Sequence, residues 1–86
     1  MQPNLPFWFR QRQGKSEAIA EEMLRLTAPN MPEAFVGIQK DVDDRWRPLV
    51  RRTADGENLA STDATYKTPS EAWEAGFEVY REVFVV

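Results

Sequence analysis

The chain has 86 residues, a formal net charge of −3 at neutral pH, and neither cysteine nor histidine. Without cysteine there are no disulfides and no thiolate sites, and without histidine the commonest metal ligand and the commonest general base are missing. We therefore expect a protein that is not an enzyme and that uses no metal and no cofactor. A chain of this length is expected to form a single domain, residues 1–86, around one two-layer core.

Neither a signal peptide nor a membrane helix is predicted. The first residues lack a basic region followed by a long apolar one, and no apolar run approaches the roughly 18 residues that span a bilayer. The sequence thus predicts a cytoplasmic protein without a membrane partner. The net negative charge also disfavours nonspecific binding along a phosphate backbone, because the strength of such binding grows with the number of Lys and Arg contacts.

The first third of the chain predicts a strand followed by a helix. Residues 5–12 are rich in aromatic side chains, and an early proline is typical of the start or edge of a strand. Residues 16–27 then predict a helix with a serine placed as its cap. Within it, Ile19, Met23 and Leu26 recur at helical spacing and predict a stripe that packs in the core. The two prolines that follow are expected to end this helix.

The next stretch predicts a three-stranded antiparallel meander. Its strands are expected at residues 36–40, 45–52 and 57–61. An aspartate-rich turn at residues 41–44 joins the first two, because aspartate side chains bond to their own backbone and stop a strand. An Asp55-Gly56 turn joins the last two, since this pair favours the positive φ angles of a tight hairpin. The first turn lacks the glycine and the closing glutamate of a calcium loop, so we interpret it as a solvated turn.

A capped amphipathic helix is predicted near the end of the sequence. Thr68 supplies the N-cap oxygen, Pro69 the first helical residue, and Glu71 a side chain that can reach back to the cap. The predicted order is therefore β-α-β-β-β-α, an α+β fold of two layers in which both helices cover one face of the sheet. That face is expected to carry the side chains of Phe7, Phe9, Trp46 and Val50.

A series of short motifs follows in a fixed order: Lys40-Asp41, Trp46-Arg47, Asp55-Gly56, Leu59-Ala60-Ser61, Tyr66-Lys67-Thr68, Ala72 and Gly76-Phe77-Glu78. Over residues 36–83 these motifs resemble the YegP-like family of short repeats. The resemblance implies a meander and helix over residues 33–86. It carries over no active-site residues, because the family's biochemical role is itself unassigned.

The sequence departs from the family pattern at two strand positions. Pro48 stands where the family has an aromatic or another strand former, and Asn58 stands where it has a β-branched residue. Because proline has no backbone donor, its strand is expected at a sheet edge or at a bulge. Residues 1–32 lie outside the resemblance. Their strand and helix are either a degenerate half of a second unit or unrelated elements.

One face of the predicted sheet collects aromatic and arginine side chains. If the first strand joins the meander, period-two alternation brings together Trp8, Arg10, Arg12, Arg47, Leu49 and Arg51. Such a face suits a protein interface, where Trp and Arg are enriched among the residues that contribute most to binding. It also suits base stacking and phosphate pairing. The third interpretation is that the arginines form cross-strand ion pairs with Asp or Glu.

These observations favour a small non-enzymatic protein-interaction domain. We expect a regulatory or inhibitory protein of bacterial or mobile-element origin that binds and occludes a larger protein partner. A nucleic-acid-binding module that uses the Arg- and Trp-rich sheet face is the alternative, which ranks second because the acidic helices would repel phosphate. An uncovered strand at the edge of the meander can also pair with a second copy, so a homodimer is a further expectation.

Overall fold

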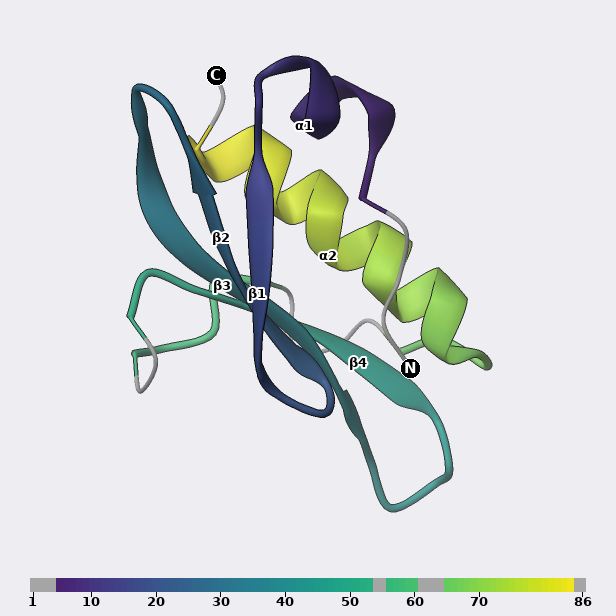
Figure 1. The fold of residues 1–86 in the computed structure, drawn as a ribbon. Helices are drawn as coiled ribbons and strands as arrows, with labels where there is room; N and C mark the ends of the chain where they lie inside the picture. The colour runs from purple at the N-terminus through teal and green to yellow at the C-terminus, as the bar shows by residue number, and fades with distance from the viewer. Residues whose placement is uncertain (1–4, 54–55, 61–64, 85–86) are drawn as a thin grey trace.

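The chain forms one antiparallel sheet of four strands together with two helices (Figure 1). A computed structural model describes residues 5–53, 56–60 and 65–84. In chain order the elements are α1 (Phe7–Gln11), β1 (Lys15–Ala20), β2 (Met23–Ala28), β3 (Met31–Lys40), β4 (Trp46–Arg51) and α2 (Pro69–Phe84). The strands lie in the order β1-β2-β3-β4. The predicted α+β class and an antiparallel sheet are confirmed, whereas the predicted order of elements in the first third of the chain and the third strand of the predicted meander are wrong.

The strand predicted at residues 5–12 is instead the short helix α1. It begins after Pro6, whose carbonyl oxygen accepts hydrogen bonds from two backbone N–H groups of the helix, both at 3.1 Å. The helical turn separates two aromatic residues that a strand would have placed on one side: Phe9 is fully buried, while Phe7 is 67% exposed. The ring of Phe9 meets the ring of Tyr80 edge to face at 5.6 Å. One buried aromatic anchor therefore outweighs the strand preference of the segment.

The helix predicted at residues 16–27 is instead a hairpin made of β1 and β2. The two strands pair in antiparallel register, with residues 21 and 22 in the turn. Leu24 and Leu26 of β2 are buried, whereas Ile19, which the helical stripe would have placed in the core, is 44% exposed. The apolar residues of β2 follow a period of two. Ile19, Met23 and Leu26 match a helical spacing only when residues of two different strands are counted as one segment.

The two prolines that were expected to end a helix shape a turn and a bulge. Pro29 and Asn30 form the two-residue turn between β2 and β3, where Asn30 has a φ of 63°. Asparagine adopts this left-handed conformation more readily than most residues do. Pro32 lies where the register between β2 and β3 shifts, so its missing N–H does not interrupt a regular ladder. As a result β3 begins at Met31, well before its predicted start.

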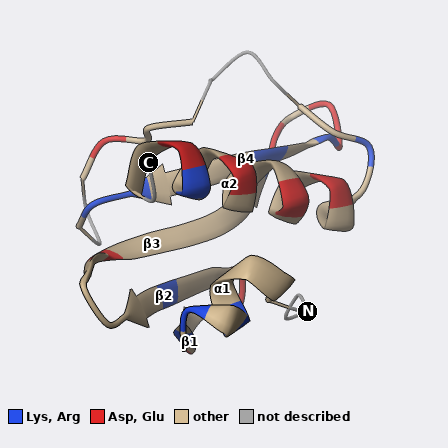
Figure 2. Cartoon of the chain, turned by 90° about the horizontal axis from the view of Figure 1, so that it is seen from above, with Lys and Arg blue, Asp and Glu red and all other residues tan. Residues whose placement is uncertain are grey.

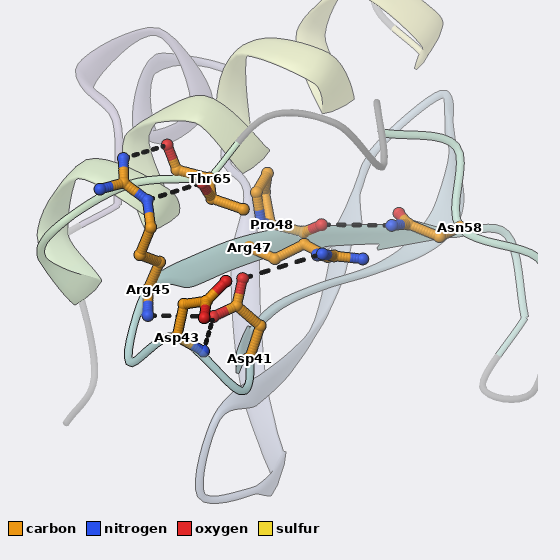
Figure 3. A network of polar contacts seen from close by, with 7 residues as sticks. All are labelled: Asp41, Asp43, Arg45, Arg47, Pro48, Asn58 and Thr65. Atoms are coloured by element: carbon orange, nitrogen blue, oxygen red, sulfur yellow. Dashed lines mark hydrogen bonds and ion pairs between the residues drawn. The ribbon is translucent and has the colours of Figure 1, made fainter.

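The aspartate-rich turn between β3 and β4 is confirmed (Figure 3). Oδ1 of Asp41 accepts hydrogen bonds from the backbone N–H groups of Asp43, at 2.9 Å, and of Arg45, at 3.1 Å. These two bonds favour the charged carboxylate and lower the pKa of Asp41 below its ordinary value of 3.8. Asp44 adopts a φ of 60° in the same turn. The side chain of Asp41 thus fixes the backbone where β3 ends.

The third strand predicted for the meander, at residues 57–61, is wrong for the residues that the structure describes. Residues 57–60 form no strand, and residue 61 lies outside the described part of the chain. The preceding Asp55-Gly56 turn is described only at its glycine, whose N–H donates to the carbonyl oxygen of Thr53 at 3.1 Å. Its aspartate lies outside the described residues. Two apolar side chains in succession after Asn58 do not give the alternation that a half-buried strand needs.

Asn58 covers the outer edge of β4 with its side chain (Figure 3). Its Oδ1 atom accepts a hydrogen bond from the N–H of Val50 at 2.9 Å, and its Nδ2 atom donates to the carbonyl oxygen of Pro48 at 3.2 Å. At the start of the strand, Trp46 and Tyr66 exchange two backbone hydrogen bonds of 2.7 Å. Pro48 therefore lies on an edge strand, as predicted, and the outward N–H groups of residues 46 and 50 are both paired.

Helix α2 begins at Pro69, as predicted, with Thr68 as its cap. The hydroxyl oxygen of Thr68 accepts a hydrogen bond from the backbone N–H of Glu71 at 3.2 Å, and the hydroxyl group donates to the Glu71 carboxylate at 3.0 Å. Gly76 permits close packing on the sheet, because a Cβ atom at this position would lie 3.2 Å from Val36. The capped helix thereby covers β3 and β4 with a continuous apolar stripe.

The prediction that two helices cover one face of the sheet is correct for α2, whereas the other predicted helix, at residues 16–27, is the hairpin of β1 and β2. Helix α1 packs beside α2 through its contact with Tyr80. Of the residues predicted for the covered face, Phe9 and Val50 are fully buried, Trp46 packs against the core, and Phe7 is exposed. A helix of five residues presents one buried side chain, which is too little to cover a sheet.

Tyr80 has a buried hydroxyl group without a hydrogen-bond partner among the described residues. Burial raises its pKa from 10.0 to about 12, because the apolar surroundings disfavour the phenolate. As the pH rises, the Tyr80 phenol ionises in the unfolded chain before it ionises in the folded protein. Its contribution to the free energy of unfolding is therefore complete below pH 10 and is lost as the pH rises towards 12. Between about pH 9 and about pH 11, we expect the wild type to lose about 1.4 kcal/mol more unfolding free energy than Tyr80→Phe in urea titrations. Equal losses in the two proteins would contradict this assignment.

Candidate interaction surface

The sheet face opposite α2 carries three arginines and two apolar residues, which we call the arginine face: Arg25, Phe35, Arg47, Leu49 and Arg51. Strand pairing aligns Arg25 of β2, Phe35 of β3 and Arg51 of β4 in one row across the sheet. Two further pairs extend the face, because Gly37 is opposite Leu49 and Gln39 is opposite Arg47. Residues directly opposite each other share a face of an antiparallel sheet, so these side chains form one surface.

The apolar residues of the arginine face are covered, although α2 lies on the other side of the sheet. Phe35 and Leu49 are each only 8% exposed. The aliphatic stems of the flanking arginines are long enough to cover such residues while their charged ends reach water. Met23 adds to this cover, because its side chain lies directly over Gly37. The surface that a partner would meet is therefore formed by charged side chains rather than by aromatic rings, and it includes Glu17 and Glu33 beside Arg25.

Carboxylates hold Arg25 and Arg47. Arg25 forms ion pairs with Glu17 at 2.9 Å and with Glu33 at 3.2 Å. Arg47 lies 3.9 Å from the carboxylate of Asp41 (Figure 3). Pairs at a protein surface contribute about 0–1 kcal/mol to stability, so they position the guanidinium groups more than they stabilise the fold. Cross-strand pairing is thus observed, and it leaves the guanidinium groups at the surface.

Only half of the site predicted from the sequence is brought together. Arg47, Leu49 and Arg51 share one face of β4, as the period of two predicted. Trp8, Arg10 and Arg12 lie in or just after α1 and do not join them. Because the predicted first strand is a helix, it cannot extend the sheet and place its side chains beside those of β4.

Trp8 contacts α2. Its ring stacks on that of Tyr80 at 5.9 Å, and the guanidinium carbon of Arg81 lies 6.0 Å from its centroid. Arg10 lies 6.0 Å from the ring of Phe7, within α1 itself. The arginine face consequently lacks the tryptophan that base stacking would have used.

Two residues of the arginine face were missed by the sequence interpretation, namely Arg25 and Phe35. Arg25 was assigned to a helix, although the alternation of Leu24, Arg25 and Leu26 is the signal of a half-buried strand. Phe35 precedes the predicted strand by one residue. Extending that strand backwards would have placed Phe35 on the same face as Arg51.

The two edges of the sheet differ in exposure. The loop around Asn58 covers β4, whereas all six residues of β1 are exposed. Lys15 and Glu17 place charges along β1, and the register of the strand shifts between Ala18 and Ala20. Charged residues and bulges are devices that limit pairing between edges. Of the two edges, β1 is the uncovered one, and its charges and register shift limit pairing with a second copy.

A comparison with models of protein families, with curated proteins and with solved structures finds no match for this chain. Within the described residues, no helix is long and apolar enough to cross a membrane.

Proposed function

We propose that this chain is a small interaction domain that binds an acidic surface of a protein partner through its arginine face and thereby occludes that partner. The proposal is carried by the row formed by Arg25, Phe35 and Arg51, which strand register aligns on a face that α2 does not cover. Arginine forms planar, bidentate hydrogen bonds with carboxylates, so a row of guanidinium groups suits a surface rich in Asp and Glu.

The two sides of the sheet differ in charge, although the arginine face also carries Glu17 and Glu33 beside Arg25. Basic residues lie on β2 and β4, and acidic residues follow the exposed side of α2 (Figure 2). The ion pairs of Arg25 and Arg47 restrain their side chains before a partner arrives, which lowers the entropy lost on binding. Such an arrangement favours one orientation of an acidic partner, because α2 would repel it.

Nucleic acid is the second candidate. The guanidinium groups would pair with phosphate as well as with carboxylate. However, Phe35 is nearly buried and Trp8 lies on α1, so the face offers no exposed ring for base stacking. The net charge of −3 also works against a phosphate backbone. These observations favour a protein partner over nucleic acid.

The test compares two double variants that remove the same number of arginines. Arg47→Glu/Arg51→Glu changes the arginine face, whereas Arg10→Glu/Arg12→Glu makes the same change of charge on exposed residues at α1. Binding of a fluorescent oligoglutamate peptide is measured by anisotropy, and binding of a short oligothymidylate is measured alongside. We expect the first variant to weaken peptide binding about tenfold or more and the second to leave it nearly unchanged. Circular dichroism verifies that both variants fold.

Three results would contradict the proposal. The peptide could fail to bind the wild type at low salt, the two variants could weaken it equally, or only the oligothymidylate could bind through the arginine face. The last result would move the nucleic-acid candidate to first place. Light scattering on the same samples measures self-association. A dimer that both variants preserve would favour β1, rather than the arginine face, as the surface for a second copy.

A further inference from the structure

A groove lies on the other side of the molecule, between α1 and the first half of α2. Its volume is about 620 Å³, Trp8 and Tyr66 contribute aromatic surface to it, and the nearly buried Phe77 lies beneath it. Glutamates at residues 71, 74 and 78 line the same groove. This volume falls within the range of about 300–1,000 Å³ that is typical of ligand sites. The groove combines two features that recognise cations, namely aromatic rings and carboxylates.

The aromatic walls of the groove are held in place by the fold. Trp8 stacks on Tyr80, and the neighbouring Phe9 is fully buried against the same ring. Tyr66 is fixed through its backbone, which exchanges two hydrogen bonds of 2.7 Å with Trp46. A ligand would therefore meet rings that are already positioned, which reduces the entropy lost on binding.

The acidic side of the groove is a stripe along α2. Glu71, Glu74 and Glu78 are three and four residues apart, so they lie on one side of the helix. Glu71 accepts the hydroxyl hydrogen bond of Thr68 and completes the helix cap. Within the described part of the chain, no Lys or Arg forms an ion pair with Glu74 or Glu78. Two exposed carboxylates are thus available beside the aromatic rings.

We propose that this groove binds an arginine side chain presented by a basic segment of a partner protein. Guanidinium stacks on aromatic rings and forms forked hydrogen bonds with carboxylates, so one side chain can use both walls. The chain itself provides an example nearby, because the guanidinium of Arg81 lies 6.0 Å from the centroid of Trp8. The groove and the arginine face lie on opposite sides of the sheet, so a variant of one leaves the other intact.

The test uses three short peptides that differ in one type of side chain. The first contains two arginines among glycines and serines, the second has citrulline in their place, and the third has lysine. Citrulline keeps the planar shape of arginine and lacks its charge. Binding is followed by the shift of the Trp8 indole N–H signal in NMR titrations. We expect saturable binding of the arginine peptide, weaker binding of the lysine peptide, and a loss of about tenfold or more with citrulline.

A matched pair of variants assigns the binding to the groove. Glu74→Gln/Glu78→Gln should weaken the arginine peptide about tenfold or more, whereas Glu57→Gln/Glu82→Gln removes the same charge outside the groove lining and should change it little. The proposal is overturned if the arginine peptide does not bind, if citrulline binds equally well, or if the two variants weaken binding alike. Self-association that only Glu74→Gln/Glu78→Gln abolishes would identify the occupant as a second copy and overturn the assignment to a partner.

Discussion

Phe9→Ala is expected to lower the free energy of unfolding by about 3–5 kcal/mol, the usual cost of removing a fully buried aromatic side chain. The ring of Phe9 is 0% exposed and meets Tyr80 of α2 at 5.6 Å. A Cβ atom on Gly14 would lie only 2.4 Å from the same ring, so the chain after α1 closes directly over it. Alanine would leave a cavity between these three elements. Urea unfolding followed by circular dichroism measures the change.

Phe7→Ala is the matched control, because it removes the same side chain two residues earlier. Phe7 is 67% exposed, so its loss should change stability by no more than about 0.5 kcal/mol. In a strand the two residues would share a face and the two variants would behave alike. Similar effects in both proteins would therefore reject the helical conformation of α1. A loss for Phe9→Ala below about 1 kcal/mol would reject its role as the anchor.

The elements that the sequence predicted correctly are those with strong local signals. The side chain of Asp41 bonds to the turn that it occupies, and Thr68 and Glu71 cap the helix that they begin. In each case the residues that form the structure are neighbours in the sequence. These local bonds define the end of β3 and the beginning of α2 without any tertiary contact.

The first third of the chain could not be assigned in the same way, because its structure depends on distant partners. β1 contains glutamate and alanine, which favour helices in isolation. It is a strand because it pairs with β2, which in turn pairs with β3. Phe9 is likewise fixed by Tyr80, far along the chain. Contacts of this kind override local preference, and the brief alternation of Leu24, Arg25 and Leu26 is the only local sign of the strand β2.

The candidate surfaces likewise combine features that local sequence predicts with features that depend on distant contacts. Alternation along one strand was sufficient to place Arg47, Leu49 and Arg51 together. Placing Arg25 beside them required β2 to be recognised as a strand that pairs with β3 across the turn at Pro29 and Asn30. The groove beside α2 required the packing of α1 against Tyr80. Surfaces built from several elements thus follow from topology and not from spacing.

Asn58→Ala is expected to lower the free energy of unfolding by about 2–3 kcal/mol, because three hydrogen bonds of the side chain are lost together. Oδ1 accepts from the N–H groups of Val50, at 2.9 Å, and Ala60, at 3.0 Å, while Nδ2 donates to the carbonyl oxygen of Pro48 at 3.2 Å. Val50 is fully buried, so its N–H would be left without a partner next to the core. Urea unfolding measures the loss.

Asn58→Asp distinguishes the acceptor role of Oδ1 from the donor role of Nδ2. The aspartate retains an acceptor for the N–H groups of Val50 and Ala60, and it places an oxygen where Nδ2 donated to Pro48. We expect it to destabilise the protein by about half as much as alanine does, since two of the three bonds survive. Alanine should also uncover the edge of β4 and increase aggregation with concentration, which light scattering detects. If both variants lowered the free energy of unfolding only slightly and by the same amount, the edge of β4 would be held by the backbone hydrogen bonds of Leu59 and Tyr66 and not by the side chain of Asn58.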